Sequence, residues 1–385
     1  MTSNIVLPLL VSAILRVSNA QEASTTSYQL VKKYTGQNFF DNFAFFSDRD
    51  PTNGFVKYVD LETANQTGLA GFASSDSFDN AIYLGVDWWS LNVTPDGRPS
   101  TRVESKDTFN HSLWIADIKH MPGGICGSWP AYWLLGEGAR WPQAGEIDIM
   151  EGINKQTVNK MVLHADTGVS IFNVTGATSS NQTQMRGTLS SLDCSLDTAG
   201  STGCVAEGSW NDFGTDYNAA GGSVLATEFT SDAIRIWNFQ RGSVPSDIAA
   251  GSPDPEAAAD SWGPPDAMFV SSGNGTFDEH FFNLKIIFNT ALCGDWIDKT
   301  WNTSECASVA PTCQDYVTNN PAVFKDAYWA IGGVQVYQQA DPSCTGMSTP
   351  LPSNRFQPCS RAQGTDAVRD ASGLIEGGNG NHNHS

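Results

Sequence analysis

The stretch RWPQAGEIDIMEGIN, residues 140–154, places three acidic residues in a run that is otherwise apolar. Side chains alternate between the two faces of a strand, so Glu146 and Asp148 share one face. Glu151 falls on the other face unless the strand contains one extra residue. If the three acids work together, the sequence therefore predicts a β-bulge at about Ile149 or Met150 that turns Glu151 back toward the other two acids.

Three carboxylates on one strand face repel one another, so at least one of their pKa values must rise. Retaining glycoside hydrolysis uses such a group, because it needs one ionised carboxylate as nucleophile and one protonated carboxyl as acid. Glu146 and Glu151 fit these roles, with Asp148 between them to hydrogen-bond Glu146. Two other interpretations stay open: a solvent-facing sheet surface and a calcium site formed by the three acids.

Aromatic residues crowd the segment just before the acids. The run GSWPAYWLLGEGARWP, residues 127–142, contains Trp129, Tyr132, Trp133 and Trp141. A scattered tryptophan is more often part of a core than of a binding site. Beside a carboxylate face, however, flat rings suit the apolar face of a pyranose, so the pattern favours a sugar-binding cleft.

The fold class follows from short β-type segments separated by Gly- and Ser-rich turns. AIRIWNF, residues 233–239, alternates so regularly that both of its faces are expected to be covered. The one convincing helical window is 313–327, and 242–267 is expected to be a long loop around Trp262. These features predict an all-β, antiparallel β-sandwich or jelly roll. The predicted strands are 82–87, 112–118, 160–165, 233–239, 283–289 and 333–338.

Composition limits the classes of partner. The 385 residues are 40% hydrophobic, which is ample for a core, and the formal net charge is -20. That charge repels nucleic acid and anionic membranes but costs nothing against a neutral ligand. We therefore expect no nucleic acid partner, no membrane partner and a monomer.

The N-terminus and the glycosylation sequons predict export. Residues 1–20 have the apolar core and small-residue end of a signal peptide, with an uncleaved anchor as the alternative. Eight N-x-[ST] sequons lie in polar settings that suit exposed loops. The expected location is secreted, extracellular or cell-wall associated. The sequons begin at Asn65, Asn92, Asn110, Asn173, Asn181, Asn274, Asn302 and Asn383.

Eight cysteines without metal-ligand spacing favour disulfides over zinc in an exported protein. The nearest neighbours make two pairs the simplest choices, Cys194 with Cys204 and Cys344 with Cys359. The other four, Cys126, Cys293, Cys306 and Cys313, leave the remaining pairing open.

The motif GEIDIMEG, with GSWPAYW before it and MVLHAD after it, resembles glycoside hydrolase family 16, and within it the fungal secreted endo-β-1,3(4)-glucanases, or laminarinases. The likeness extends over residues 39–60, 101–133, 292–306 and 324–338. The E-x-D-x-x-E form is that of the laminarinase-like branch. The resemblance implies a concanavalin-like β jelly roll with an open substrate cleft, acting on β-1,3 or mixed β-1,3/1,4-glucans with no cofactor and no metal.

The same resemblance implies roles for individual residues. Glu146 corresponds to the nucleophile, Glu151 to the general acid/base and Asp148 to an auxiliary carboxylate. His164 matches a cleft histidine near the acid/base, with a plain core histidine as the alternative. The residues expected to bind substrate are Trp129, Trp133, Trp141, His164, Arg102, Tyr58 and Trp296.

The predicted organisation is a signal peptide at 1–20, a catalytic domain at 21–340 and a Pro/Ser/Gly-rich extension at 341–385, partly disordered.

Two features depart from the family pattern. No cysteine follows His164 closely, so Cys126 is expected to pair elsewhere or stay unpaired, and Lys57 puts a charge where a neutral residue is usual. The competing functions are a transglycosylase of the same family and a non-catalytic β-glucan-binding protein.

Overall fold

The computed structural model describes residues 27–339 except 76–77, 92, 94, 175–184, 198–200, 210 and 273–276. The predicted signal peptide and the extension at 341–385 lie outside these ranges. Within them, no helix is both long and apolar enough to cross a membrane.

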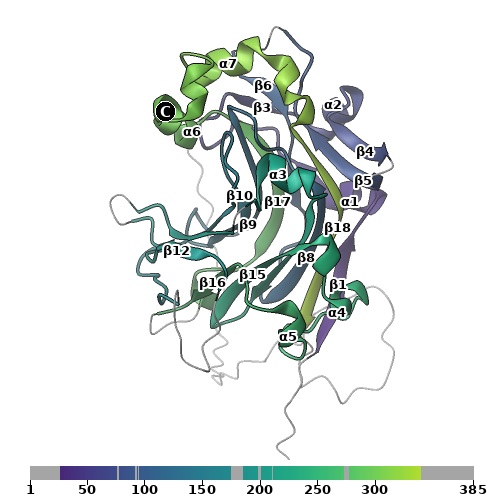
Figure 1. Cartoon of the computed structure of the whole chain (residues 1–385), viewed down its shortest axis with the longest axis vertical. Helices are drawn as coiled ribbons and strands as arrows, with labels where there is room; N and C mark the ends of the chain where they lie inside the picture. Colours follow the sequence, from purple (N-terminus) through teal and green to yellow (C-terminus); the bar gives the residue numbers. More distant parts are fainter. Residues whose placement is uncertain are drawn as a thin grey trace, which may run out of the picture. The chain divides into compact units, whose positions relative to one another are not determined.

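Two large antiparallel sheets make up most of the fold (Figure 1). The first runs in the order β16 (Ala267–Val270), β15 (Ala233–Gln240), β14 (Ser223–Phe229), β8 (Ser112–His120), β18 (Tyr328–Gln339), β5 (Phe78–Gly85) and β4 (Ala70–Ser75), with β1 (Tyr28–Tyr34) paired to β18. The second runs in the order β12 (Thr188–Ser191), β13 (Cys204–Glu207), β11 (Lys160–His164), β10 (Glu146–Glu151), β9 (Ser128–Gly136), β17 (Leu284–Leu292), β7 (Arg102–Ser105) and β2 (Phe43–Phe45). A short parallel pair joins β3 (Val56–Tyr58) to β6 (Arg98–Ser100). The predicted β-sandwich is confirmed, and each predicted strand overlaps an observed one.

Helices are short and lie in the connections. The predicted window 313–327 is confirmed as α7 (Cys313–Asn319) followed by the 3-10 helix η5 (Pro321–Asp326). The segment 242–267, expected to be a loop, contains two single-turn helices. The sequence did not reveal the other helices, because three to six residues are too few to show a helical period. They are α1 (Gln37–Asn42), α2 (Leu61–Gln66), α3 (Gly214–Ala219), α4 (Ser246–Ala249), α5 (Ala259–Trp262) and α6 (Asp295–Thr300), with η1 (Arg241–Ser243), η2 (Phe277–Glu279), η3 (Trp301–Thr303) and η4 (Glu305–Ser308).

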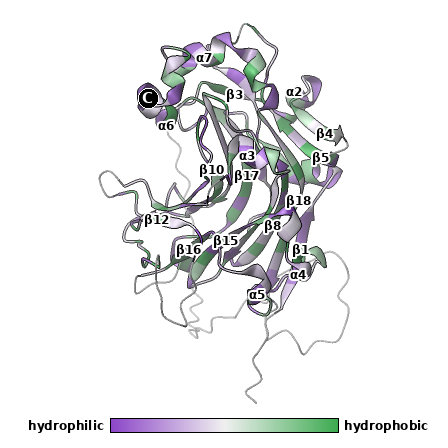
Figure 2. Ribbon diagram, in the orientation of Figure 1, coloured by the Kyte–Doolittle hydropathy of each residue, from purple (hydrophilic) through white to green (hydrophobic). Residues whose placement is uncertain are grey.

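Hydrophobic and hydrophilic residues alternate along several strands (Figure 2). The buried apolar residues on the two faces belong to separate cores. In β15, Ile234 and Ile236 join the large core, while Trp237 and Phe239 pack edge to face against Trp262 in a second cluster. The prediction that both faces of this strand are covered is therefore confirmed. The segment carrying α4 and α5 supplies Trp262 and so covers the second face.

Three disulfides join the cysteines that the structure describes. The predicted bond Cys194–Cys204 is confirmed, whereas Cys344 and Cys359 lie outside the described residues. Cys126 pairs with Cys306 across 180 residues, and Cys293 pairs with Cys313. Both of the latter bonds lie in a third apolar cluster beside α6 and α7, at one end of the sheets in Figure 1.

Candidate active site

The predicted bulge is present in β10. Along β9, Trp133 pairs with Asp148 and the next residue, Tyr132, pairs with Met150, so Ile149 is the additional residue. The side chain of Ile149 turns into the core together with Met150. As a result, Glu146, Asp148 and Glu151 all line one cavity.

That cavity is a cleft of about 500 Å³ on the second sheet. Every second residue of β9 lines it, because the intervening side chains of β9 point into the core. Three of the predicted tryptophans, Trp129, Trp133 and Trp141, contribute to its wall, and Trp141 is 54% exposed. The remaining lining residues are Asp50, Pro51, Thr52, Arg102, Ala131, Leu135, Gly136, Ala139, Asn289, Ala291 and Asp295.

Each outer acid accepts a hydrogen bond from a tryptophan. The indole N–H of Trp141 donates to Glu146 Oε2 at 2.7 Å, and that of Trp129 donates to Glu151 Oε1 at 2.8 Å. These donors stabilise the ionised form of each carboxylate. They also fix the orientation of the indole rings that line the cleft.

Burial raises the pKa of both Glu146 and Glu151 above the ordinary carboxyl range, and the negative charge of Asp148 raises both further. Opposing this, the positive charge of His164 lowers both pKa values. Both glutamates feel the negative charge of Asp148, so the site favours holding a proton on one of them.

His164 lies against the central acid. Its Nε2 is 3.3 Å from Asp148 Oδ2 and 3.8 Å from Glu146 Oε1. Burial alone would lower the pKa of His164, but the contact with Asp148 and the charges of the glutamates outweigh it and raise the pKa to about 9. A cationic imidazole therefore balances Asp148, which is only 1% exposed. This arrangement differs from a plain core histidine, which would be neutral.

Asn159 holds the backbone that the bulge leaves unpaired. Its side-chain Oδ1 accepts from the Glu151 N–H at 2.9 Å, and its Nδ2 donates to the Ile149 carbonyl at 2.8 Å. Its own N–H donates to Asp212 Oδ1 at 2.7 Å. A bulge interrupts the ladder on the strand that carries it, and a buried amide that is not paired costs about 1–3 kcal/mol. Asn159 thus replaces the missing ladder bonds and fixes the position of Glu151.

We expect Asn159→Ala to lower kcat on a polymeric glucan by about 10- to 100-fold, because small displacements of a catalytic group are costly. The loss should shrink on an aryl glycoside with a good leaving group, which needs little help from the acid. Steady-state kinetics on both substrates would measure this.

Asn218 offers a matched control, because its amide makes the same two bonds with the Met121 backbone, both at 2.9 Å, away from the acids. Asn218→Ala should lower thermal stability. Any change in its kcat should be the same on the glucan and on the aryl glycoside. An equal kcat loss on both substrates for Asn159→Ala would contradict a positioning role.

The other predicted binding residues are not all in the cleft. Arg102 lines it, with its guanidinium carbon 5.0 Å from the Trp133 ring centre. Tyr58 is buried outside it and reaches it only through its hydroxyl, which accepts from Asn289 Nδ2 at 3.1 Å. Trp296 lies in an adjoining pocket of about 430 Å³, in edge contact with Trp129.

Lys57, singled out as a possible charge near the cleft, is exposed and lines a different pocket.

Sequence reasoning missed Asn289, which accepts from the Trp133 indole N–H at 2.8 Å and so orients that ring. A polar residue closing the apolar run NLKIIFN was the one signal available. It also missed Asp50, which reaches the cleft from a loop, and Asp295, which reaches it from the first residue of α6.

A metal ligand set can be drawn from the same residues. Glu146, Asp148 and His164 bring one ligand atom each to within 4.8 Å of one another. The raised pKa of His164 favours the protonated ring, which offers no lone pair to a cation. The calcium site considered from Glu146, Asp148 and Glu151 is not among the clusters found in the described residues.

Comparison with known proteins places this geometry in a family. A family model described as "XgeA-like, catalytic GH16 domain" matches residues 43–337. An endo-1,3(4)-beta-glucanase of Arthroderma benhamiae is 40% identical over 334 residues, covering 85% of this chain and 68% of that protein. A protein of Aspergillus fumigatus named probable endo-1,3(4)-beta-glucanase is 39% identical over 336 residues, covering 86% of this chain and 48% of its own length. The chain spans about half the length of most of the curated relatives it matches.

Two solved structures agree with this assignment. One, described as an elongating GH family 16 beta-1,3-glucosyltransferase, is 40% identical, with a TM-score of 0.69 over 81% of this chain and all of that one. The other is laminarinase 16A of Phanerochaete chrysosporium with glucans in its donor and acceptor sites, 36% identical with the same TM-score and the same coverage of both chains. Because the family model covers most of the chain and the relatives share its sequence and fold, the chain belongs to glycoside hydrolase family 16.

Proposed function

We propose that this chain is a secreted, retaining endo-β-1,3(4)-glucanase, with residues 21–340 as its catalytic domain and no cofactor. The observation that carries the proposal is the bulge at Ile149. It brings Glu146 and Glu151 to one face, in a cleft walled by tryptophans, where burial raises the pKa of both. A β-glucan is neutral, which suits a chain with a net charge of -20.

The mechanism is double displacement. A Glu146 carboxylate oxygen bonds to the anomeric carbon while the glycosidic C–O bond breaks, and the Glu151 carboxyl proton moves to the departing oxygen. Glu151, now a carboxylate, then takes a proton from water as that water displaces Glu146. The sugar leaves with its original anomeric configuration, and both acids return to their starting states.

The remaining residues support these steps. Asp148 and cationic His164 keep the charge beside Glu146 balanced as it loses and regains its negative charge. Trp133 and Trp141 stack on glucose rings, and Trp129 holds Glu151. Trp296, beyond Trp129, extends the binding surface past the acid/base.

A family transglycosylase is the second candidate, because one 40%-identical structure is described as an elongating β-1,3-glucosyltransferase. Its acids would do the same chemistry, with a sugar hydroxyl replacing water in the second step. The two candidates differ in their products, so chain lengths measured over time decide between them.

One assay tests both candidates. Laminarin, barley β-glucan and lichenan are incubated side by side, and reducing ends and product sizes are followed. Hydrolysis predicts new reducing ends and shorter products. Products longer than the starting glucan would show that the chain is a transglycosylase instead. Binding without any release of reducing ends would identify a glucan-binding protein instead.

Export is supported by the three disulfides and by the surface position of sequons. All four sequon asparagines within the described residues, Asn65, Asn110, Asn173 and Asn302, are exposed. A mass shift on treatment with an N-glycosidase, for protein collected from the culture medium, would test both secretion and glycosylation.

A further inference from the structure

A second pocket lies beside the cleft and is used by nothing described so far. It encloses about 330 Å³ and shares no lining residue with the cleft. Most of its lining comes from the loop after β2, strand β3, helix α2 and residues 87–90 after β5, with Leu69 and Pro99 completing it. The wall combines polar groups, including Ser47, Asp60, Thr63 and Thr67, with a larger apolar surface.

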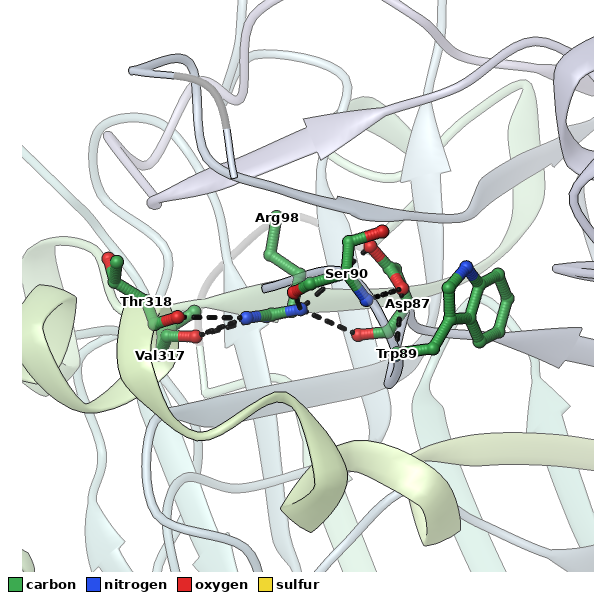
Figure 3. Close-up of polar contacts among 6 residues, drawn as sticks. All are labelled: Asp87, Trp89, Ser90, Arg98, Val317 and Thr318. Atoms are coloured by element: carbon green, nitrogen blue, oxygen red, sulfur yellow. Dashed lines mark hydrogen bonds and ion pairs between the residues drawn. The ribbon is translucent and has the colours of Figure 1, made fainter. Parts of the chain in front are cut away.

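The loop between β5 and β6 is held by a buried ion pair (Figure 3). Arg98 has no exposed surface, and its guanidinium donates to the carbonyls of Asp87 and Ser90, both at 3.1 Å. From the other side it donates to the Val317 carbonyl through Nε at 3.0 Å and Nη2 at 2.7 Å. Arg98 thus ties residues 87–90 to the end of α7.

The acidic member of the pair fixes the same loop. Asp87, 2% exposed, accepts from the N–H groups of Trp89 at 3.0 Å and Ser90 at 3.1 Å through Oδ1. The backbone on both sides of Trp89 is therefore set by charge-assisted hydrogen bonds, which are the stronger kind. Residues 87–90 cannot shift without unpairing Arg98, whose burial alone would be costly.

The side chain that this clamp positions is nevertheless exposed. Trp89 keeps 45% of its surface open and lines the pocket, with Trp88 in edge contact at 5.6 Å. A preorganised indole loses little entropy when a ligand packs on it. An open aromatic ring beside hydroxyls and a carboxylate is the composition that a neutral sugar needs.

We propose that this pocket is a second carbohydrate site, in which the Trp89 indole packs on glucose rings of a β-glucan and Asp60, Thr63 and Ser90 bond their hydroxyls. The proposal rests on the proposed function for the identity of the sugar. Lys57 and Asp60 balance each other's charge, which suits a neutral polyol better than an anionic one. Tyr58 lines this pocket while its hydroxyl bonds cleft residue Asn289, so the two sites are neighbours.

A second attachment point raises the local concentration of a polymer at the cleft, but gives no advantage to a chain too short to reach both. We therefore expect Trp89→Ala to lower kcat/KM on laminarin polymer by about 3- to 10-fold, mainly through KM. Turnover of laminaritriose should stay within about twofold. Trp89→Phe should restore most of the loss on the polymer. Phe172→Ala, which removes another exposed aromatic ring, 56% exposed, should change neither.

Binding without turnover separates this inference from the proposed function. The full-length Glu146→Gln variant, with and without Trp89→Ala, is run on native gels that contain laminarin. Weaker retardation with Trp89→Ala supports the site whether or not the wild type hydrolyses glucans. Unchanged retardation, or an equal activity loss on polymer and trisaccharide, would overturn it even if the wild type is an active glucanase.

Discussion

Glu146→Gln is expected to lower the release of reducing ends from laminarin by at least about 10⁴-fold, the scale of nucleophile loss in other hydrolases. The amide cannot form the covalent intermediate, yet it keeps the shape of the carboxyl and can still meet the Trp141 N–H through its oxygen. Binding of oligosaccharide should therefore persist. Reducing-end assays and calorimetric titration with laminarihexaose measure the two effects separately.

Glu137→Gln is the matched control, because Glu137 is an exposed acid just after β9 whose carboxylate forms an ion pair with Lys285 at 2.6 Å. The same chemical change there should leave turnover unaltered. Turnover near the wild-type rate by Glu146→Gln would remove Glu146 from the nucleophile role and leave the double-displacement mechanism without its first step.

Glu151→Gln is expected to lower turnover of laminarin by about 10²- to 10⁴-fold, because the amide can neither protonate the departing oxygen nor activate water. The loss in the first step should be much smaller for an aryl glycoside whose leaving group departs without a proton. Such a substrate should then show a burst of released phenol, since formation of the intermediate is fast and its hydrolysis is slow.

The pH dependence of activity gives a second test of the role of Glu151. Burial raises the pKa of Glu151, so the acid stays protonated above the ordinary carboxyl range, and activity is lost as pH rises through this raised pKa. Glu146 must be ionised, so activity is lost on the acid side as pH falls through its own raised pKa. Glu151→Gln should remove the alkaline limb and keep the acid limb. An alkaline limb that survives in this variant would assign it to another group.

The strand that carries the acids shows how far local pattern extends. Alternation alone placed Glu146 and Asp148 together and called for an extra residue before Glu151 if the three acids act together, and the observed register has that residue at Ile149. This inference depends on neighbouring residues in one strand, where side-chain direction is determined by position.

Alternation within a strand does not predict contacts between residues that are far apart in the sequence. Asn289 orients Trp133 from a strand 156 residues away, and Cys126 joins Cys306 at a separation of 180. Tyr58 resembles a substrate-binding residue by motif, but the fold places its ring outside the cleft and leaves only its hydroxyl in touch with Asn289. Strand order decides such pairings, and no local period encodes strand order.

By itself the sequence determined the sandwich class, the acidic group, its bulge and the aromatic residues that precede it, because each depends on alternation or composition within a few residues. Only the tertiary structure decided that Asn159 holds the bulge, that His164 balances Asp148, and that Arg98 clamps the loop of Trp89. Each of these requires burial and a partner brought from a different part of the chain. The charge states and the rigidity of the sites follow from those partners, so they appear only when the sheets are assembled.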